Sequence, residues 1–148
     1  MKVAIITGAS AGIGSATAQA FQGDGFAVYN IARRACPVQG VTNLACDLSS
    51  EAAIASACAT LEQAVAGCSE VALVHNASQM LKDRADDCAS DKLRQVMQTN
   101  IIAVNSINQR LLPLLPRTSS VLYVGSTLAE KEVPGAFSYI VSKHAQRG

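Results

Sequence analysis

The chain has no long hydrophobic run, no excess of charge of one sign and no paired-cysteine motif. Its first apolar run, Val3 to Ile6, is far shorter than the hydrophobic region of a signal peptide or a membrane span, and it leads directly into glycines. The net charge is +1, with acids and bases interspersed, which disfavours binding to nucleic acid or anionic lipid. We therefore expect a soluble cytoplasmic protein whose partner is a small molecule, not a nucleic acid or a membrane.

The cysteines also lack the patterns of a structural or metal-binding framework. There are five, an odd number, with no CxxC and no paired histidine spacing. Neither a disulfide framework nor a zinc site is indicated, and no metal is expected. We predict that these residues are reduced and act as small apolar side chains, mostly on buried faces: Cys36, Cys46, Cys58, Cys68 and Cys88.

The 148 residues suit one domain, residues 1–148, in which short apolar runs alternate with helical patterns. Strands are predicted at Val3–Thr7, Phe26–Ile31, Val41–Cys46, Val71–His75 and Ser120–Gly125. Helices are predicted at Gly12–Gln22, from Ser49 or Ser50 to just before Gly67, from Ser90 to Pro113 with a buried stripe of Leu93, Met97, Ile101, Val104 and Leu111, and from about Phe137. This alternation predicts an α/β fold, a doubly wound parallel sheet that binds ligands at the carboxyl ends of its strands.

A glycine-rich turn follows the first predicted strand. Gly8, Gly12 and Gly14 would let the chain turn tightly and let a pyrophosphate approach backbone N–H groups at the start of a helix. The alternative is an ordinary glycine-rich turn, but its place at the start of a βαβ unit favours a dinucleotide. The cofactor-binding residues predicted here are Thr7, Gly8, Ser10, Gly12, Ile13 and Gly14.

The end of the second predicted strand bears on the choice of cofactor. A carboxylate there would bind the ribose of NAD, but the chain has Ala32 followed by Arg33 and Arg34, which favours the 2′-phosphate of NADP. A solvated basic turn is the alternative, and NAD stays possible because Ala11 stands where a further basic residue would have strengthened the case. Asp47 would either accept a hydrogen bond from the adenine amino group or cap the following helix.

Two residues near the end of the chain have the spacing of an acid/base pair. Tyr139 and Lys143 lie at i and i+4 on a predicted helix and so share one face. An ammonium beside a phenol stabilises the phenolate, which can then exchange a proton with a carbonyl or alcohol oxygen near neutral pH. An ordinary surface pair is the alternative for this spacing alone.

Two further polar residues are candidates for the same chemistry. Ser126 directly follows a predicted strand, where its hydroxyl can bind the substrate oxygen that Tyr139 protonates, or cap a loop. Asn100 lies on the apolar stripe of the long helix, where a buried amide needs partners. It would either hold a water for proton relay or be a satisfied core amide.

With these motifs in this order, the chain resembles the short-chain dehydrogenase/reductase family, in the subgroup with a TGxxxGIG turn. The resemblance implies a Rossmann-like fold and an oxidoreductase that transfers hydride between NADP(H) and a carbonyl or secondary alcohol. By the resemblance Tyr139 is the acid/base, Lys143 also binds the nicotinamide ribose, Ser126 orients the carbonyl and Asn100 completes the relay. Asn76 and Ala77 would lie beside the cofactor, and the family's dimers and tetramers imply a homodimer or homotetramer.

The chain departs from the family pattern in two ways. The family's NNAG segment reads His75, Asn76, Ala77, Ser78 here; His75 is expected to be a hydrogen-bonded core residue, and Ser78 places a side chain where backbone approaches the cofactor. The family also continues past the Tyr/Lys helix, so the fold is expected to be truncated before its last strands, with Ser120–Gly125 left as a sheet edge. We expect a portion of a longer protein, and an NAD-dependent enzyme or a non-catalytic nucleotide-binding module or fragment are the alternatives.

Overall fold

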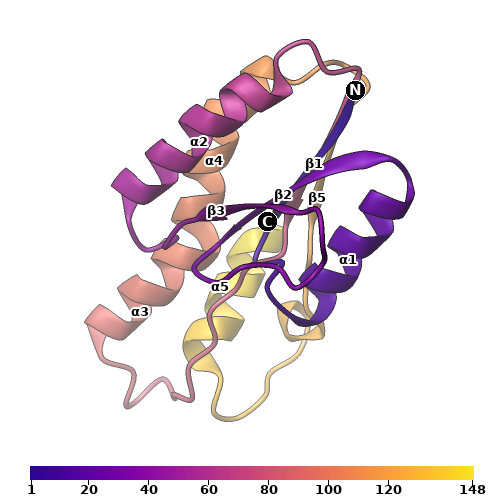
Figure 1. Ribbon diagram of the computed structural model, residues 1–148. Helices are drawn as coiled ribbons and strands as arrows, with labels where there is room; N and C mark the ends of the chain where they lie inside the picture. The colour runs from indigo at the N-terminus through magenta and orange to yellow at the C-terminus, as the bar shows by residue number, and fades with distance from the viewer.

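The computed structural model describes residues 1–148 as a parallel five-stranded sheet with helices on both faces (Figure 1). The strand order is β3-β2-β1-β4-β5, and every neighbouring pair is parallel. The strands are β1 (Lys2–Thr7), β2 (Phe26–Ala32), β3 (Thr42–Ala45), β4 (Glu70–His75) and β5 (Ser120–Tyr123). The predicted α/β class, a doubly wound Rossmann-like sheet, is confirmed.

Helices connect β1 to β2, β3 to β4 and β4 to β5, whereas residues 33–41 connect β2 to β3 without a helix, and a last helix follows β5. They are α1 (Gly12–Gly23), α2 (Glu51–Val65), α3 (Ser90–Met97), α4 (Ala103–Leu111) and α5 (Phe137–Arg147), with short turns η1 (Gln98–Ile102), η2 (Leu112–Leu114) and η3 (Thr127–Ala129). Helix α2 starts where Ser50 accepts a hydrogen bond from the Ala53 amide. It ends before Gly67, whose φ of +72° suits the residue that follows a helix.

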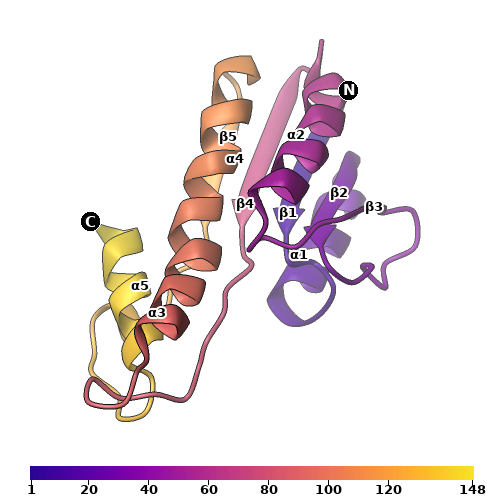
Figure 2. The same ribbon diagram turned by 90° about the vertical axis from the view of Figure 1, so that its left-hand side faces the viewer.

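Two hydrophobic layers lie on opposite faces of the sheet. Helices α2 and α4 pack together on one face, and α1 covers the other (Figures 1 and 2). The larger layer includes Ile54 and Leu61 of α2 with Ile107 of α4. The smaller one joins Ala18 of α1 to the opposite face of β1 and β4. Strand β1 is therefore apolar on both sides, as expected for the central strand of a covered parallel sheet.

The long helix predicted from Ser90 to Pro113 is interrupted by a π-helical turn, η1. The buried face lies one residue to the N-terminal side of the stripe predicted from the sequence, both before and after this turn, so that stripe is wrong except at its end. The residues that face the interior are Val96, Asn100, Ala103, Ile107 and Leu111, while Leu93, Met97, Ile101 and Val104 are half-buried. A π turn of this kind is often found at a functional position in a helix.

Strand β5 forms one edge of the sheet, as the sequence predicts, although it is two residues shorter than expected. Its Leu122 and Tyr123 side chains are 44% and 47% exposed.

Four of the five cysteines are buried and Cys88 is half-buried, and all five are free thiols. None of the helices is both long enough and apolar enough to cross a membrane.

Candidate active site

The glycine turn between β1 and α1 leaves no room for side chains at two of its positions. At Gly8, whose φ is +74°, a Cβ atom would lie 2.9 Å from Ala77 Cα. At Gly14 a Cβ atom would collide with the Gly8 carbonyl oxygen and lie 2.5 Å from Asn76 Nδ2. Gly12 has open space around it but a φ of +55°, which favours glycine for conformational reasons.

The N-terminus of α1 is open to an anion. Its N-cap residue, Ala11, provides no side-chain hydrogen bond, and the first turn of the helix has no acidic residue. The first backbone N–H groups and the positive end of the helix dipole are therefore free of any capping side chain. A phosphate is the kind of ligand that such a helix start binds.

The glycine turn is tied to the end of β4. Asn76 Nδ2 donates to the carbonyl oxygens of Thr7 and Gly8, each at 3.0 Å. The Thr7 hydroxyl oxygen accepts from the backbone amides of Asn76 and Ala77, also at 3.0 Å. These four bonds hold the carboxyl ends of β1 and β4 together beside the turn.

A residue that the sequence analysis missed, Asn30, ties the same turn to β2. Asn30 is fully buried, and its Oδ1 accepts from the Ala9 amide at 2.9 Å. Its Nδ2 donates to the Arg34 carbonyl oxygen at 3.1 Å and to Asn43 Oδ1 at 3.0 Å. Asn30 thus positions both the glycine turn and the basic turn. An amide inside an otherwise apolar strand was the available signal, because such a group must find partners.

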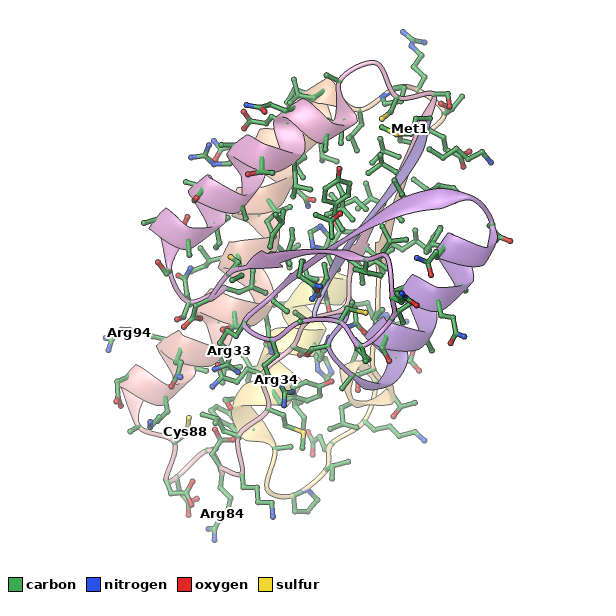
Figure 3. The ribbon with its side chains drawn as sticks, viewed as in Figure 1. Met1, Arg33, Arg34, Arg84, Cys88 and Arg94 are labelled. Carbon is green, nitrogen blue, oxygen red and sulfur yellow. The ribbon has the colours of Figure 1, made fainter.

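A cavity of about 420 Å³ lies at the carboxyl edge of the sheet, where these segments meet. Its walls come from the glycine turn (Gly8, Ser10), the end of β2, the segment after β3 and the segment after β4. The predicted cofactor residues that line it are Gly8, Ser10, Arg33, Arg34, Asp47, Asn76 and Ala77. Ser78 lines it too, as its position in the HNAS segment implied. Figure 3 shows Arg33 and Arg34 together, below the middle of the molecule in this view.

Asp47 does not cap α2, so that part of the prediction is wrong. Ser50 caps the helix, and Asp47 Oδ1 instead accepts from the amide and the hydroxyl of Ser49, at 2.9 and 2.7 Å. The hydrogen bond from the Ser49 amide is the main cause that lowers the pKa of Asp47. The bond from the Ser49 hydroxyl and the positive charge of Arg33 lower it further. An ionised, exposed carboxylate therefore faces the cavity beside Arg33.

Tyr139 and Lys143 lie together on α5. The Lys143 ammonium is 5.6 Å from the centre of the Tyr139 ring, and the lysine is 4% exposed. Its Nζ donates to the Val124 carbonyl oxygen at 3.1 Å and to Gln146 Oε1 at 3.0 Å. Burial lowers the pKa of Lys143. The prediction that the two side chains share one face is confirmed.

Ser126 lies at the start of η3, and α5 packs against η3. Its Oγ accepts a hydrogen bond from the Leu128 amide at 3.1 Å, so Ser126 caps this turn. Capping was one of the two roles that the sequence indicated, and binding of the substrate oxygen was the other. A hydroxyl that accepts one bond can still donate its hydrogen to a second partner. The two interpretations of Ser126 are therefore compatible.

Asn100 lies in the π turn, and both polar atoms of its side-chain amide have hydrogen-bond partners. Its Oδ1 accepts from the Gln79 amide at 2.7 Å, and its Nδ2 donates to the Gln79 carbonyl oxygen and to Ser142 Oγ, each at 2.9 Å. Ser142 in turn donates to the Tyr139 carbonyl oxygen at 2.7 Å. Asn100 thus connects the segment after β4 to the helix that carries Tyr139. Gln79 and Ser142 could not be recognised from the sequence because neither belongs to a motif.

His75 is buried at the end of β4, and its contacts are those of a core residue. Its Nε2 is 2.8 Å from Asn108 Oδ1, and its ring stacks on Tyr123 with 5.1 Å between centroids. Burial lowers the pKa of His75, while the hydrogen bond to Asn108 acts in the opposite direction.

The residues that line the cavity and the set Ser126, Tyr139 and Lys143 both lie at the carboxyl ends of the strands, but the two groups are separate. Ser126, Tyr139 and Lys143 do not line the 420 Å³ cavity. They lie on the β5 side, where α5 packs against α3, η1 and η3 (Figure 2). Asn76, which follows the strand between the two groups, is on the cavity side.

The family model described as short chain dehydrogenase matches residues 2–148. The chain belongs to the short-chain dehydrogenase family. An uncharacterised oxidoreductase of Mycobacterium tuberculosis is 36% identical to this chain over 153 residues, covering 98% of the chain and 59% of the relative. The farnesol dehydrogenase of Aedes aegypti is 28% identical over 162 residues, covering 97% and 65%.

One solved structure with the same fold is a complex with NAD. The Brucella ovis oxidoreductase of this family, described in complex with a partially ordered NAD, superposes with a TM-score of 0.87 at 29% identity. The match covers 97% of this chain and 72% of that structure's chain. The chain described here is shorter than the curated relatives that it matches, because it spans 55% to 65% of their length.

Proposed function

We propose that this chain binds NADP and transfers hydride between NADP(H) and a ketone, aldehyde or secondary alcohol, with Tyr139 as the acid/base. The observation that carries the proposal is the buried Lys143 ammonium over the Tyr139 ring, on a helix at the edge where the glycine turn opens a cavity. Membership of an oxidoreductase family supports the reaction class.

The cavity and the helix start fit a dinucleotide. The free N–H groups of α1, with Gly8, Gly12, Ile13 and Gly14 around them, would hold the pyrophosphate. Arg33 and Arg34 would bind the 2′-phosphate, and Asp47 the adenine amino group. Thr7, Ser10, Asn76 and Ala77 would shape the wall beside the cofactor, and Tyr139 and Lys143 would contact the nicotinamide ribose.

The bound nicotinamide supplies or accepts the hydride, and the side chains of the chain manage the proton. In reduction the Tyr139 hydroxyl would give its proton to the substrate oxygen, and the Lys143 ammonium would stabilise the phenolate left behind. The Ser126 hydroxyl would donate a hydrogen bond to the same oxygen. Asn100 would support the proton relay through the position of Tyr139, because its side chain connects the segment after β4 to the helix that carries Tyr139.

The test compares wild type with Tyr139→Phe in the purified chain. NADPH binding is followed by the change in nicotinamide fluorescence, and turnover by NADPH oxidation with a panel of ketones and aldehydes. We expect Tyr139→Phe to bind NADPH within about twofold of wild type and to lose turnover by about a thousandfold, in keeping with the loss of a general acid/base. Retained turnover in Tyr139→Phe would contradict the assignment.

One alternative has specific support. The NAD in the Brucella ovis structure favours an NAD-dependent enzyme, which would show a higher affinity for NADH than for NADPH. Binding of NADPH without its oxidation by any carbonyl would instead indicate a cofactor-binding module without turnover. We also propose that the protein is a cytoplasmic homodimer or homotetramer, which light scattering on the purified chain tests for oligomeric state.

A further inference from the structure

Helix α5 has no cap of its own, although it carries Tyr139 and Lys143. Its N-cap residue, Ala136, makes no side-chain hydrogen bond, and its first turn has no acidic residue. The segment before it, residues 131–134, is exposed. A helix with these features would fray at its start unless another part of the molecule held it.

That part is Asp83, in the segment between β4 and α3. Its Oδ1 accepts a hydrogen bond from the Ser138 amide at 3.0 Å. Its backbone N–H donates to the Gly135 carbonyl oxygen, and its carbonyl oxygen accepts from the Phe137 amide, each at 3.2 Å. These backbone bonds make a parallel bridge between Asp83 and Ala136. Every hydrogen bond that residues 131–138 make to a distant part of the chain goes to Asp83.

The carboxylate is itself fixed in place. Asp83 is 8% exposed, and its Oδ2 accepts from the Cys88 thiol at 3.3 Å. The Cys88 amide donates to the Arg84 carbonyl oxygen, which closes a turn directly after Asp83. Burial raises the pKa of Asp83, but the hydrogen bonds from Ser138 and Cys88 outweigh this and lower it. Figure 3 shows Arg84 and Cys88 on this loop, at the end of the molecule away from Met1.

We propose that Asp83 is a positioning residue for Tyr139: it caps α5 from a distant segment, and this fixes the first turn of the helix in which Tyr139 lies. The first turn of α5 has no acidic residue, so the negative charge of Asp83 is the one that interacts favourably with the positive end of the helix dipole. The inference rests on the proposed function for its catalytic consequence, but not for the contact itself.

The test uses the whole chain with three variants: Asp83→Ala, Asp83→Asn and Asp86→Ala. Asn can still accept from the Ser138 amide, so Asp83→Asn is the rescue variant. Asp86 belongs to the same loop, but its contact is with exposed Arg84, so Asp86→Ala is the control. The readouts are amide hydrogen exchange at residues 137–140, NADPH affinity, and kcat and KM with the best carbonyl of the panel.

For Asp83→Ala we expect exchange at residues 137–140 to rise at least tenfold while exchange in β1 is unchanged. We expect kcat to fall about tenfold or more, with NADPH affinity within twofold. Asp86→Ala should match wild type in all readouts, and Asp83→Asn, which keeps the acceptor but loses the charge, should lie between Asp83→Ala and wild type. Unchanged exchange in Asp83→Ala, or an unchanged kcat despite faster exchange, would overturn the proposal. If Asp83→Ala does not fold, Asp83→Glu displaces the carboxylate by one methylene and should give the same pattern to a smaller extent.

Failure of the proposed function is distinguishable from failure of this inference. If wild type oxidises no NADPH with any carbonyl, the oxidoreductase assignment fails, and exchange at residues 137–140 still decides whether Asp83 holds the helix. If wild type turns over and Asp83→Ala is indistinguishable from it, only the positioning role fails.

Discussion

The ammonium of Lys143 lies 5.6 Å from the centre of the Tyr139 ring, and the lysine is almost completely buried without a carboxylate partner. Its hydrogen bonds go to a backbone carbonyl and to a neutral amide, on Val124 and Gln146. A buried cation that no anion balances destabilises the folded state, so its retention needs a reason other than stability. A phenolate formed at Tyr139 would be that missing anion.

Replacing Lys143 should therefore stabilise the fold at neutral pH. Because burial lowers its pKa, the unfolded chain binds more protons than the folded chain between the lowered value and the usual 10.5. The free energy of unfolding thus rises with pH across that window, and the unfavourable contribution is complete below it. Lys143→Met should be more stable than wild type by about 1 kcal/mol at pH 7, with the difference shrinking towards pH 10.5. Urea unfolding at several pH values measures this, and Lys131→Met, at an exposed position, is the control. A difference that stays constant with pH would contradict the argument.

Gly14→Ala should disrupt the turn through a direct clash. The added Cβ would meet the Gly8 carbonyl oxygen and Asn76 Nδ2, neither of which can move without breaking the bonds between β1 and β4. We expect a loss of about 3 kcal/mol in urea unfolding, typical of an overpacked site. Gly23→Ala, at a helical position with open space, should be neutral or stabilising by about 0.5 kcal/mol. Equal stability of the two variants would rule out the close approach.

Asn30→Ala should weaken both the fold and cofactor binding. It leaves the Ala9 amide and the Arg34 carbonyl without their partner in a buried place. We expect a loss of about 2 kcal/mol in the free energy of unfolding and weaker NADPH binding, since both turns at the cavity lose a support. Asn105→Ala, on the exposed face of α4, should change stability by less than about 0.5 kcal/mol. If NADPH affinity is unchanged, Asn30 supports the fold alone.

Arg33→Ala separates the two cofactors. Loss of a charged hydrogen bond to the 2′-phosphate should lower NADPH affinity by about 10- to 100-fold and leave NADH affinity nearly unchanged. Fluorescence titration with both nucleotides gives the ratio. Arg84→Ala, a surface arginine paired with Asp86, is the matched control and should affect neither. An equal loss for both nucleotides would favour NAD or a general electrostatic role.

The elements of the fold could be predicted because each depends on local sequence. Apolar runs such as Val71–His75 and the cap at Ser50 carry their own signals, and so does the glycine turn. The π turn at Asn100 could not be predicted, because no local rule distinguishes it from a regular helix. The predicted stripe through Met97 and Ile101 was also one residue away from the true buried face through Val96 and Ala103. Which of two adjacent rows of a helix is buried depends on the elements that pack against it.

The supporting residues of the site were harder to foresee than its reacting groups. Tyr139, Lys143 and Ser126 have a recognisable spacing, whereas Asn30 and Asp83 act through partners distant in sequence. Ser138 is 55 positions from Asp83, and Ala9 is 21 positions from Asn30. Only the fold brings such pairs together, and Asp83 in a polar loop resembles any solvated acid until the structure places α5 against it.

The strand order has a consequence for synthesis on the ribosome. Strand β1 is made before the other four strands, yet it occupies the centre of the sheet between β2 and β4. After β2 has emerged, one edge of β1 stays unpaired until Glu70–His75 has also left the exit tunnel. Its apolar residues Val3 to Ile6 therefore stay partly exposed while more than sixty further residues are made. Pausing of translation before residue 75 would lengthen this exposure and favour aggregation of the nascent chain.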